Sequence, residues 1–339
     1  MLLSAGVAAY ADEEWREVVG EEFTFTEVRS GVWHVRGSGT IAVGSNGALV
    51  VNDRDALLVD SHMTPAAARA LLADLPLVTD KPIRDLVNTH FHFDHVHGNQ
   101  VFGSEVEILA HEYTHAKIAS GGTQRGRGYE AFIAAIPQRM QQVQEQIEQA
   151  SAEEKQQLTQ RLERMRRIWE QEQETRPTAP TLTLQEAVTL YRGGREIRIL
   201  HFGRGHTGGD VVVYLPEERV LVAGDLITGG LPYMGDGFLL EWADTLEPLT
   251  QLEIDVILPG HGAAFTQVER LGFLQMYLRD LWRKLVELHA QGVSAQEAAA
   301  SVDMSAHRER IPDVEQAGVS RHTVDRVYEL LDANGSQGP

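Results

Sequence analysis

The chain contains no cysteine, and this absence limits the chemistry available to it. Without a thiol there is no disulfide, no thiolate nucleophile and no zinc–sulfur site. A metal site would therefore have to use imidazole nitrogen, carboxylate oxygen or backbone oxygen. Beyond its first residues the chain also lacks a run of about 20 apolar residues, so a membrane span is not expected.

Positive charge is scarce, because 30 Lys and Arg residues face 49 Asp and Glu residues, giving a formal net charge of −19. A field of this sign repels phosphate backbones, so nucleic acid is not an expected partner. A small-molecule substrate, even an anionic one, remains compatible because bound metal ions reverse the local potential. Hydrophobic residues make up 42% of the 339 residues, which is enough for a sizeable core.

The first residues, MLLSAGVAAYA, are small and apolar, and Ala9-Tyr10-Ala11 has the A-x-A form of a signal-peptidase site. The basic segment that normally precedes such a site is missing, since the first cationic residue is Arg16. We interpret residues 1–21 as an N-terminal extension with a shortened export signal, and we expect a periplasmic or secreted protein. An ordinary frayed terminus on a cytoplasmic protein is the alternative.

Residues 22–290 show strand and helix patterns that predict a layered α/β fold. Aromatic and β-branched residues indicate several strands between residues 22 and 60. A helix with Thr64 as its N-cap is expected next, followed by the short strands IRDLV and VEILA. Strand patterns resume after residue 180, and Gly272 to Ala290 reads as one long helix. The order strand, helix, strand is typical of α/β layers.

Residues 129–175 have a different pattern. Apolar residues recur there at steps of three and four, with Gln, Glu and Arg between them, which predicts an amphipathic helical hairpin. Ser151 and Glu154 have the spacing of a capping box that begins the second arm. A lid over the site, an outward protrusion and a homodimer contact all remain open for this hairpin. Residues 291–339 are expected to form a C-terminal helical extension.

Four histidines and one aspartate lie in the stretch NTHFHFDHVHGN, residues 88–99, directly after an apolar strand pattern. Imidazole and carboxylate groups suit zinc and similar divalent ions, and a tight loop can aim alternate side chains at one point. His90, His92, Asp94 and His95 are too many ligands for one ion that must keep an open position. The cluster therefore favours two metal ions that share the loop.

Three further ligand-type residues occur where strand patterns end, each with a glycine beside it: His206 in GRGHTGGD, Asp225 in VLVAGD and His261 in DVILPGH. Glycine lets the backbone approach closely. Together with the loop, these residues supply enough groups for two ions that share a bridging carboxylate.

This ordered set resembles the metallo-β-lactamase superfamily. The resemblance covers residues 22–290 and consists of H-x-H-x-D-H, G-H-T, G-D and G-H motifs, with an early aspartate, Asp60, at a strand end. It implies an α/β fold in the form of a four-layer αββα sandwich, with the site at one edge of the sheets.

By that resemblance, the terminal ligands divide between two ions: His90, His92 and His206 hold the first, and Asp94, His95 and His261 hold the second. Asp225 bridges the ions, and Asp60 accepts a hydrogen bond from a ligand histidine and so fixes its tautomer. The implied cofactor is two Zn²⁺ per chain, with Mn²⁺ or Fe²⁺ as alternatives. The implied reaction is hydrolysis of an ester, lactone or cyclic-amide bond by a metal-bridging hydroxide, which Asp94 orients as the catalytic residue.

Departures from family patterns keep other activities open. Asp225 stands where the cysteine-bearing β-lactamase subclasses have Cys, whereas lactonases share H-x-H-x-D-H and the bridging aspartate. A mononuclear iron oxidoreductase similar to the persulfide dioxygenases is one alternative, and a thioester hydrolase is another. A scaffolding protein with a vestigial site is a third, which an intact ligand set argues against.

The sequence also contains two weaker functional signals, a short histidine motif and an aromatic loop. His111 to His115 reads HEYTH and matches the H-E-x-x-H motif of zincin proteases, but no third ligand accompanies it, so we expect structural histidines. The loop GGLPYMGDGFLLEW contains Tyr233, Phe238 and Trp242, which are predicted to form an apolar wall for the substrate. Packing beneath the sheets is the alternative for these aromatic side chains.

Overall fold

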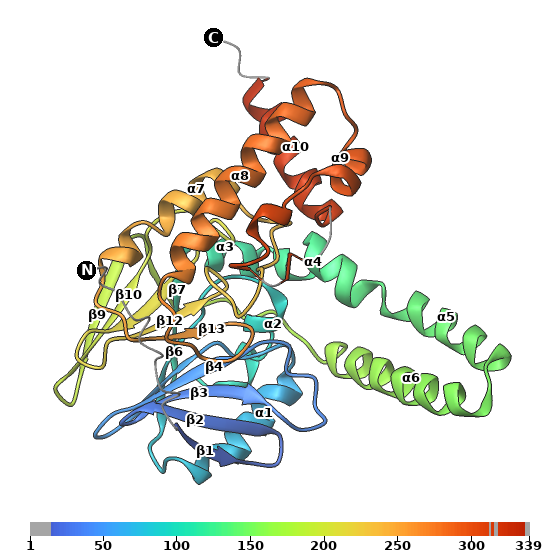
Figure 1. Ribbon diagram of the computed structural model, residues 1–339. Helices are drawn as coiled ribbons and strands as arrows, with labels where there is room; N and C mark the ends of the chain where they lie inside the picture. Colours follow the sequence, from blue (N-terminus) through green and yellow to red (C-terminus); the bar gives the residue numbers. More distant parts are fainter. Residues whose placement is uncertain (1–14, 312, 315–317, 336–339) are drawn as a thin grey trace, which may run out of the picture.

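The computed structural model describes residues 15–311, 313–314 and 318–335, and the structural statements below refer to these residues. Two β-sheets stack face to face, with helices on their outer faces (Figure 1). The predicted four-layer αββα sandwich is confirmed. The predicted export signal, in the stretch MLLSAGVAAYA, lies within residues 1–14 and so outside the described residues.

The first sheet has eight strands, which neighbour one another in chain order. They are β1 (Arg16–Val19), β2 (Phe23–Arg29), β3 (Val32–Gly37), β4 (Gly47–Val51), β5 (Ala56–Val59), β6 (Ile83–Val87), β7 (Glu107–His111) and β8 (Leu182–Leu184). The pairs from β1 to β5 are antiparallel, and those from β5 to β8 are parallel. Because β1 pairs with β2, the sheet begins before residue 22, the predicted start of the domain. β1 is a largely exposed edge strand, so it lacks a periodic apolar pattern.

The second sheet has five strands in the order β13-β12-β11-β10-β9. They are β9 (Ala187–Arg192), β10 (Arg195–Leu200), β11 (Val212–Leu215), β12 (Val220–Gly224) and β13 (Val256–Pro259). Only the pair of β12 and β13 is parallel. The strand-like stretch TLTLQEAVTLY divides into β8 in the first sheet and β9 in the second. Alternation of apolar residues predicts a strand, but it does not predict the sheet to which the strand belongs.

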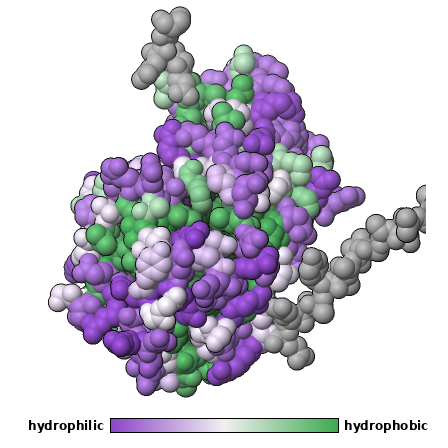
Figure 2. All heavy atoms as spheres, turned by 90° about the vertical axis from the view of Figure 1, so that its left-hand side faces the viewer, coloured by the Kyte–Doolittle hydropathy of each residue, from purple (hydrophilic) through white to green (hydrophobic). Residues whose placement is uncertain are grey.

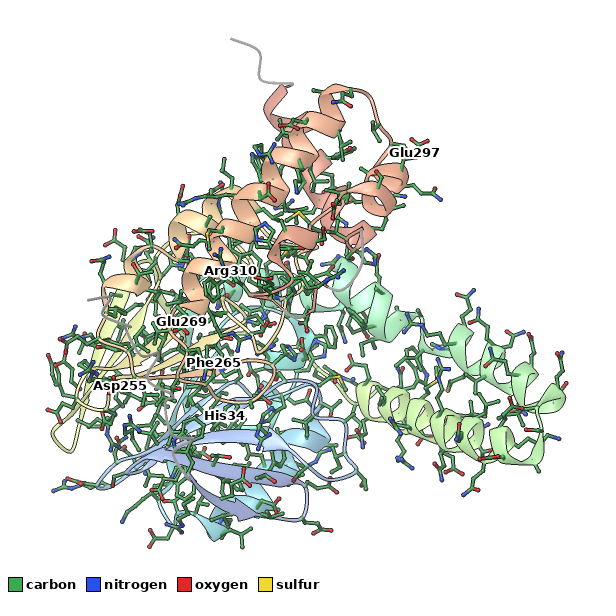
Figure 3. All side chains as sticks on the ribbon, in the orientation of Figure 1. His34, Asp255, Phe265, Glu269, Glu297 and Arg310 are labelled. Carbon is green, nitrogen blue, oxygen red and sulfur yellow. The ribbon has the colours of Figure 1, made fainter. Side chains whose placement is uncertain are left out.

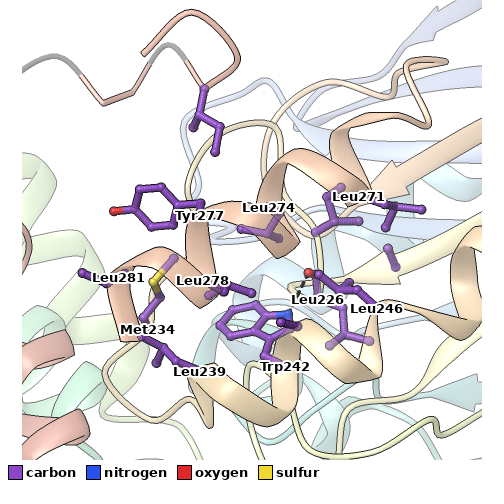
Figure 4. Packing of buried hydrophobic residues seen from close by; sticks show 14 of the residues in the cluster. Leu226, Met234, Leu239, Trp242, Leu246, Leu271, Leu274, Tyr277, Leu278 and Leu281 are labelled. Atoms are coloured by element: carbon purple, nitrogen blue, oxygen red, sulfur yellow. Dashed lines mark hydrogen bonds between the residues drawn. The ribbon is translucent and has the colours of Figure 1, made fainter. Parts of the chain in front are cut away.

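Alternating strand residues create three apolar layers. One lies between the sheets and includes Leu57 and Ile197. A second joins the first sheet to α1, where Leu71 is buried, and a third joins the second sheet to α7 and α8 around Trp242 (Figure 4). The covering helices are α1 (Pro65–Asp74), α3 (Glu112–Ala119), α7 (Leu239–Thr245) and α8 (Arg270–Ala290). As predicted, Thr64 caps α1 by accepting a hydrogen bond from the Ala67 N–H.

The helical hairpin is present and consists of α5 (Ile136–Gln149) and α6 (Ala152–Glu172), preceded by the short α4 (Arg127–Tyr129) and a π-helical turn (Glu130–Ala134). The predicted capping box is confirmed, because the Ser151 N–H donates to Glu154 Oε2 at 2.9 Å and the Glu154 N–H returns a bond to Ser151 Oγ. Both arms project away from the sandwich (Figure 1). Only the root of the hairpin lies near the rest of the fold, and the homodimer contact stays a prediction.

The C-terminal residues form α9 (Ala295–Ser301) and α10 (Arg321–Gly335). Ser294 starts α9 with another capping box. Val302 and Val324 belong to the same apolar cluster as α8 and the outer face of the second sheet. The predicted helical extension therefore packs on the sandwich as a continuation of its core.

Polar contacts also join the two sheets. The ring Nε2–H of His34, in β3, donates to the carbonyl oxygen of Pro259 at the end of β13, at 3.3 Å. Figure 3 labels His34 in its place in the fold. Burial lowers the pKa of His34 to about 4, so the ring is neutral there.

Hydrophilic residues cover much of the face in Figure 2, with hydrophobic residues in patches between them. Among the described residues, no helix combines the length and the apolar character needed to cross a bilayer.

Candidate metal centre

The seven predicted ligands come from loops at the ends of strands in both sheets. The histidine-rich loop and α2 (Phe93–Val96) follow β6, and His206 lies in the loop between β10 and β11. Asp225 directly follows β12, and His261 follows β13. Because β5 and β6 are parallel, as are β12 and β13, their carboxyl ends meet at one edge of the sandwich.

The structure brings all seven residues together. Their ligand atoms form three overlapping groups, each within 4.8 Å: His90, His92 and His206; His90, His95 and Asp225; and Asp94, His95 and His261. The first and third groups are the two ligand sets that the family resemblance implies. The second group lies between them and contains the predicted bridging carboxylate.

Asp225 occupies the centre of this arrangement. Its Oδ1 atom lies 3.5 Å from His95 Nε2, and its Oδ2 atom lies 3.5 Å from His206 Nε2 and 3.3 Å from His261 Nε2. His261 Nε2 is also 3.2 Å from Asp94 Oδ2. One carboxylate therefore faces histidines of both ligand sets, which is the position that a bridging ligand requires.

Several buried ligand atoms lack a hydrogen-bond partner, and this bears on whether cations fit the site. His90 Nε2, His95 Nε2 and Asp225 Oδ1 are buried and have no hydrogen-bond partner among the described residues. Each such atom costs about 1–3 kcal/mol unless something satisfies it. Imidazole and carboxylate donors at this spacing suit divalent cations, so the residues fit the group that the sequence implies.

A hydrogen-bond relay sets the tautomers of two ligand histidines. Asp60 Oδ2 accepts from His95 Nδ1 at 2.7 Å and from the Thr89 hydroxyl at 2.8 Å. Since that hydroxyl donates to Asp60, it can only accept from His90 Nδ1, which lies 3.0 Å away. Both rings then carry their proton on Nδ1 and present the Nε2 lone pair to a metal. The structure thus places Asp60 where it was predicted and adds Thr89, which the sequence analysis missed.

Asp236 is a second residue that the sequence analysis missed. Its Oδ2 atom accepts from His92 Nε2 at 3.1 Å, which leaves Nδ1 of that ring to face His206 Nε2 at 2.9 Å. The two histidines and Asp236 are far apart in sequence, and no local motif marks the aspartate. Its one signal is its place in the loop that follows Asp225.

The electrostatics of the cluster depend on burial and on the carboxylates. Burial lowers the pKa of His90 well below its usual value and that of His206 to about 3. Asp225 chiefly raises the pKa of His261 to about 11, and against the effect of burial it raises that of His95 to about 9. Without a cation, protons on these two rings balance the carboxylates, so metal binding and proton release are coupled.

Two backbone features keep the centre compact. A Cβ atom on Gly260 would lie 2.1 Å from Asp225 Oδ1 and 2.9 Å from His95 Cε1, so only glycine fits at this position. Asp60 has a φ of 62°, in the left-handed region that side chains rarely adopt. Such a conformation persists where the surrounding structure enforces it, and here it directs Asp60 at the ligand loop.

The HEYTH motif forms no metal site. His111 is the N-cap of α3, and its Nδ1 accepts from the Tyr113 N–H at 3.1 Å. His115 lies within the helix, and its Nδ1 is 2.9 Å from the carbonyl oxygen of Pro180. The two rings therefore have separate structural partners, and neither joins a ligand group among the described residues. The expectation of structural histidines agrees with this placement.

A cavity of about 440 Å³ opens beside the ligands and is lined by His92, Asp94, Asp225 and His261. Tyr233 also lines it, as predicted for a substrate contact. Its ring lies edge-on to His92, with the ring centroids 5.9 Å apart.

Phe238 and Trp242 do not line this cavity, which corrects their predicted placement. Trp242 is 0% exposed, and its indole N–H donates to the Leu226 carbonyl oxygen at 3.1 Å within the core (Figure 4). Phe238 is buried between the guanidinium groups of Arg204 and Arg326, 4.2 Å and 4.5 Å from its ring centroid. Sequence position alone does not distinguish an aromatic wall from aromatic core packing.

The model of the metallo-beta-lactamase superfamily matches residues 40–261. The chain therefore belongs to this superfamily, as its ordered ligand motifs indicated. Two solved structures share the fold: a metallo-beta-lactamase from Pontibacter korlensis, with a TM-score of 0.55 and 20% identity, and the DIM-1 metallo-beta-lactamase, with 0.53 and 18%. Each alignment covers 76% of this chain, and 100% and 98% of the respective structures.

Curated relatives carry several activities in their names. A linear primary-alkylsulfatase from Pseudomonas sp. is 24% identical over 80% of this chain, and a type 2 metallo-beta-lactamase from Bacillus cereus is 23% identical over 65% of it. An acyl-coenzyme A thioesterase from Gallus gallus is 24% identical over 72% of the chain. The alignments cover 53%, 68% and 76% of these relatives, so the chain spans about half the length of the alkylsulfatase.

Proposed function

We propose that this protein is a metal-dependent hydrolase that holds two divalent ions, with zinc as the expected metal, and cleaves an ester, lactone or cyclic-amide bond. The observation that carries the proposal is the meeting of seven ligand side chains, with Asp225 at their centre, next to an open cavity. His90, His92 and His206 would hold one ion. Asp94, His95 and His261 would hold the other.

Bound divalent ions would polarise the scissile bond and provide a nucleophilic water near neutral pH. Asp94 lines the cavity, and Ser45 Oγ donates to its backbone oxygen at 2.6 Å, which holds the residue in place. Its carboxylate can accept the proton of the attacking water and deliver it to the leaving group. His95 and His261 lower the pKa of Asp94 against the effect of burial, so its carboxylate is ionised.

Sulfate esters and thioesters are further candidates within this proposal. The names of the alkylsulfatase and thioesterase relatives suggest these two bond types. The apolar lining of the cavity favours substrates with a hydrophobic part. The one-iron oxidoreductase remains an alternative. Two ligand sets that share Asp225 favour two ions over one.

The test is a panel of β-lactams, lactones, aryl esters, thioesters and alkyl sulfates, assayed with and without a chelator and alongside metal analysis. We expect two zinc ions per chain and turnover of at least one class that the chelator abolishes. One iron per chain without hydrolysis would instead favour the oxidoreductase.

Variants separate the metal centre from the HEYTH motif. His90→Ala should abolish both metal loading and turnover, because it removes a ligand of the first set. His111→Ala should leave both near wild type, because that side chain caps α3 and belongs to none of the ligand groups among the described residues. The reverse result would contradict the proposed centre.

A further inference from the structure

Apart from the metal ligands, the cavity is lined mainly by apolar residues. Its apolar lining includes Met63, Phe93, Phe132, Ile133, Ile136 and Ile168. Four of these six residues belong to the root of the helical hairpin, in the π-helical turn, α5 and α6. The insertion that projects from the sandwich therefore also builds one wall of the cavity.

We propose that the hairpin root is a specificity element that binds an alkyl or acyl chain of the substrate while the metal ligands face the bond to be cleaved. The inference rests on the proposed function and assigns its substrate class: amphiphilic esters with a flexible apolar chain. The hairpin then acts as a fixed wall, because its distal part projects away from the site (Figure 1).

Charge supports an apolar occupant for this part of the cavity. Among the described residues that line it, none is lysine or arginine. The acidic residues in its lining are Asp94 and Asp225, which belong to the ligand groups. A substrate portion with its own charge would find no partner on the hairpin side and would lose its hydration there.

The rim of the cavity has an exposed aromatic side chain. Phe132 is 53% exposed, an unusual state for a phenylalanine, and its ring centroid lies 6.3 Å from that of Tyr233 on the opposite loop. Tyr233 in turn packs edge-on to the ligand His92. This row of rings runs from the metal ligands to the cavity mouth, along the path that a bound chain would cover.

A buried polar contact holds the hairpin root in position. Glu172, at the end of α6, is only 2% exposed, and its carboxylate lies 3.1 Å from His97 Nδ1, just after the metal loop. Thr175 Oγ1 also donates to this carboxylate, at 3.4 Å. At the start of the hairpin, the Tyr129 ring packs against Phe93 and His97, with centroids 5.8 Å and 6.0 Å away. Both ends of the insertion are thus fixed to the element that carries the ligands.

A chain-length series of p-nitrophenyl esters, from acetate through butyrate, hexanoate and octanoate to decanoate, tests the proposal on the metal-loaded protein. Each methylene buried against the hairpin should raise kcat/KM about fourfold, until the chain outgrows the cavity. Alkyl sulfates of the same lengths should show the same trend if that is the cleaved bond. A wild-type preference for acetate would overturn the proposal.

A matched pair of variants on α6 locates the effect. Ile168→Glu places a carboxylate in the apolar wall, whereas Leu158→Glu makes the same change toward the distal end of the helix, outside this cavity. We expect Ile168→Glu to remove the chain-length trend, and Leu158→Glu to keep both the trend and acetate turnover. Because Phe132 is exposed, Phe132→Ala should fold as the wild type does and should still flatten the trend. This variant tests the same wall if Ile168→Glu misfolds. Equal trends in all three variants would overturn the proposal.

Binding of a dansyl-labelled undecanoic acid, which contains no cleavable ester, separates the two hypotheses. If no ester or sulfate is cleaved, the proposed function fails, but the inference stands if Ile168→Glu weakens probe binding at least tenfold relative to Leu158→Glu. Equal binding by both variants would overturn the inference even if hydrolysis is observed.

Discussion

Asp60 and His95 form a buried hydrogen bond, with Asp60 Oδ2 2.7 Å from His95 Nδ1. The same oxygen accepts from Thr89, whose hydroxyl accepts in turn from His90. One carboxylate, itself not a ligand, therefore sets the tautomer of a histidine in each of the two outer ligand groups. This contact links the end of strand β5 to the loop after β6. The candidate metal centre therefore depends on how these two neighbouring strands end at the sheet edge.

Substitution of Asp60 by asparagine should weaken metal binding about 10–100-fold, because the amide nitrogen that replaces one carboxylate oxygen cannot accept a hydrogen bond. The bond from the Thr89 N–H to Oδ1 and the bonds from His95 and the Thr89 hydroxyl to Oδ2 then cannot all be kept. Chelator competition followed by metal analysis would measure the loss. Asp53→Asn, in the exposed turn between β4 and β5, removes the same charge and should bind metal as the wild type does. Equal affinity in both variants would show that Asp60 does not orient its neighbours.

Gly260→Ala should reduce occupancy of the centre, because the added Cβ would fall 2.1 Å from Asp225 Oδ1 and force the bridging carboxylate to move. The control is Gly272→Ala in α8, where a Cβ meets no atom within 4 Å. That change should leave metal content intact and raise stability by up to about 1 kcal/mol, because alanine favours a helix. Metal content and urea unfolding report the two effects, and full loading of Gly260→Ala would contradict the predicted clash.

Asp74→Ala should lower the free energy of unfolding by about 2–4 kcal/mol. The buried Asp74 carboxylate accepts the backbone N–H groups of Glu21, Glu22 and Phe23, at 3.1, 2.9 and 3.0 Å, and joins the end of α1 to β2. The substitution leaves those donors without this acceptor. Urea denaturation would measure the change, with Asp80→Ala as the exposed control, expected within about 0.5 kcal/mol of wild type. A similar small effect at Asp74 would refute its structural role.

The C-terminal helices should lose a stabilising contact in acid. Although partial burial opposes the effect, hydrogen bonds from Lys284, His307 and Arg283 lower the pKa of Asp280 from 3.8 to about 2. Ionised Asp280 therefore stabilises the fold above the unfolded-state pKa, and this contribution is lost as the pH falls through about 2. The urea midpoint of Asp280→Asn should lie below that of wild type near about pH 5, and the gap should narrow toward about pH 3. A gap that does not change with pH would contradict this account.

The candidate metal ligands could be identified from sequence because their signals are local. His90, His92, Asp94 and His95 lie within six consecutive positions, and each remaining ligand stands beside glycine at the end of an apolar strand pattern. The helical hairpin and its capping box were predictable for the same reason, since helix periodicity and N-cap chemistry are confined to a few turns of chain.

Only the tertiary structure decided which residues support and surround those ligands. Asp236 reaches His92 across 144 positions, and Thr89 relays a hydrogen bond only because β5 and β6 lie side by side. Trp242, predicted at the cavity, lies in the core, and the hairpin root forms the cavity wall instead. The sequence by itself determined the donor set, since ligand chemistry resides in each side chain. Partners and cavity walls depend on which distant segments pack together, so they followed only from the fold.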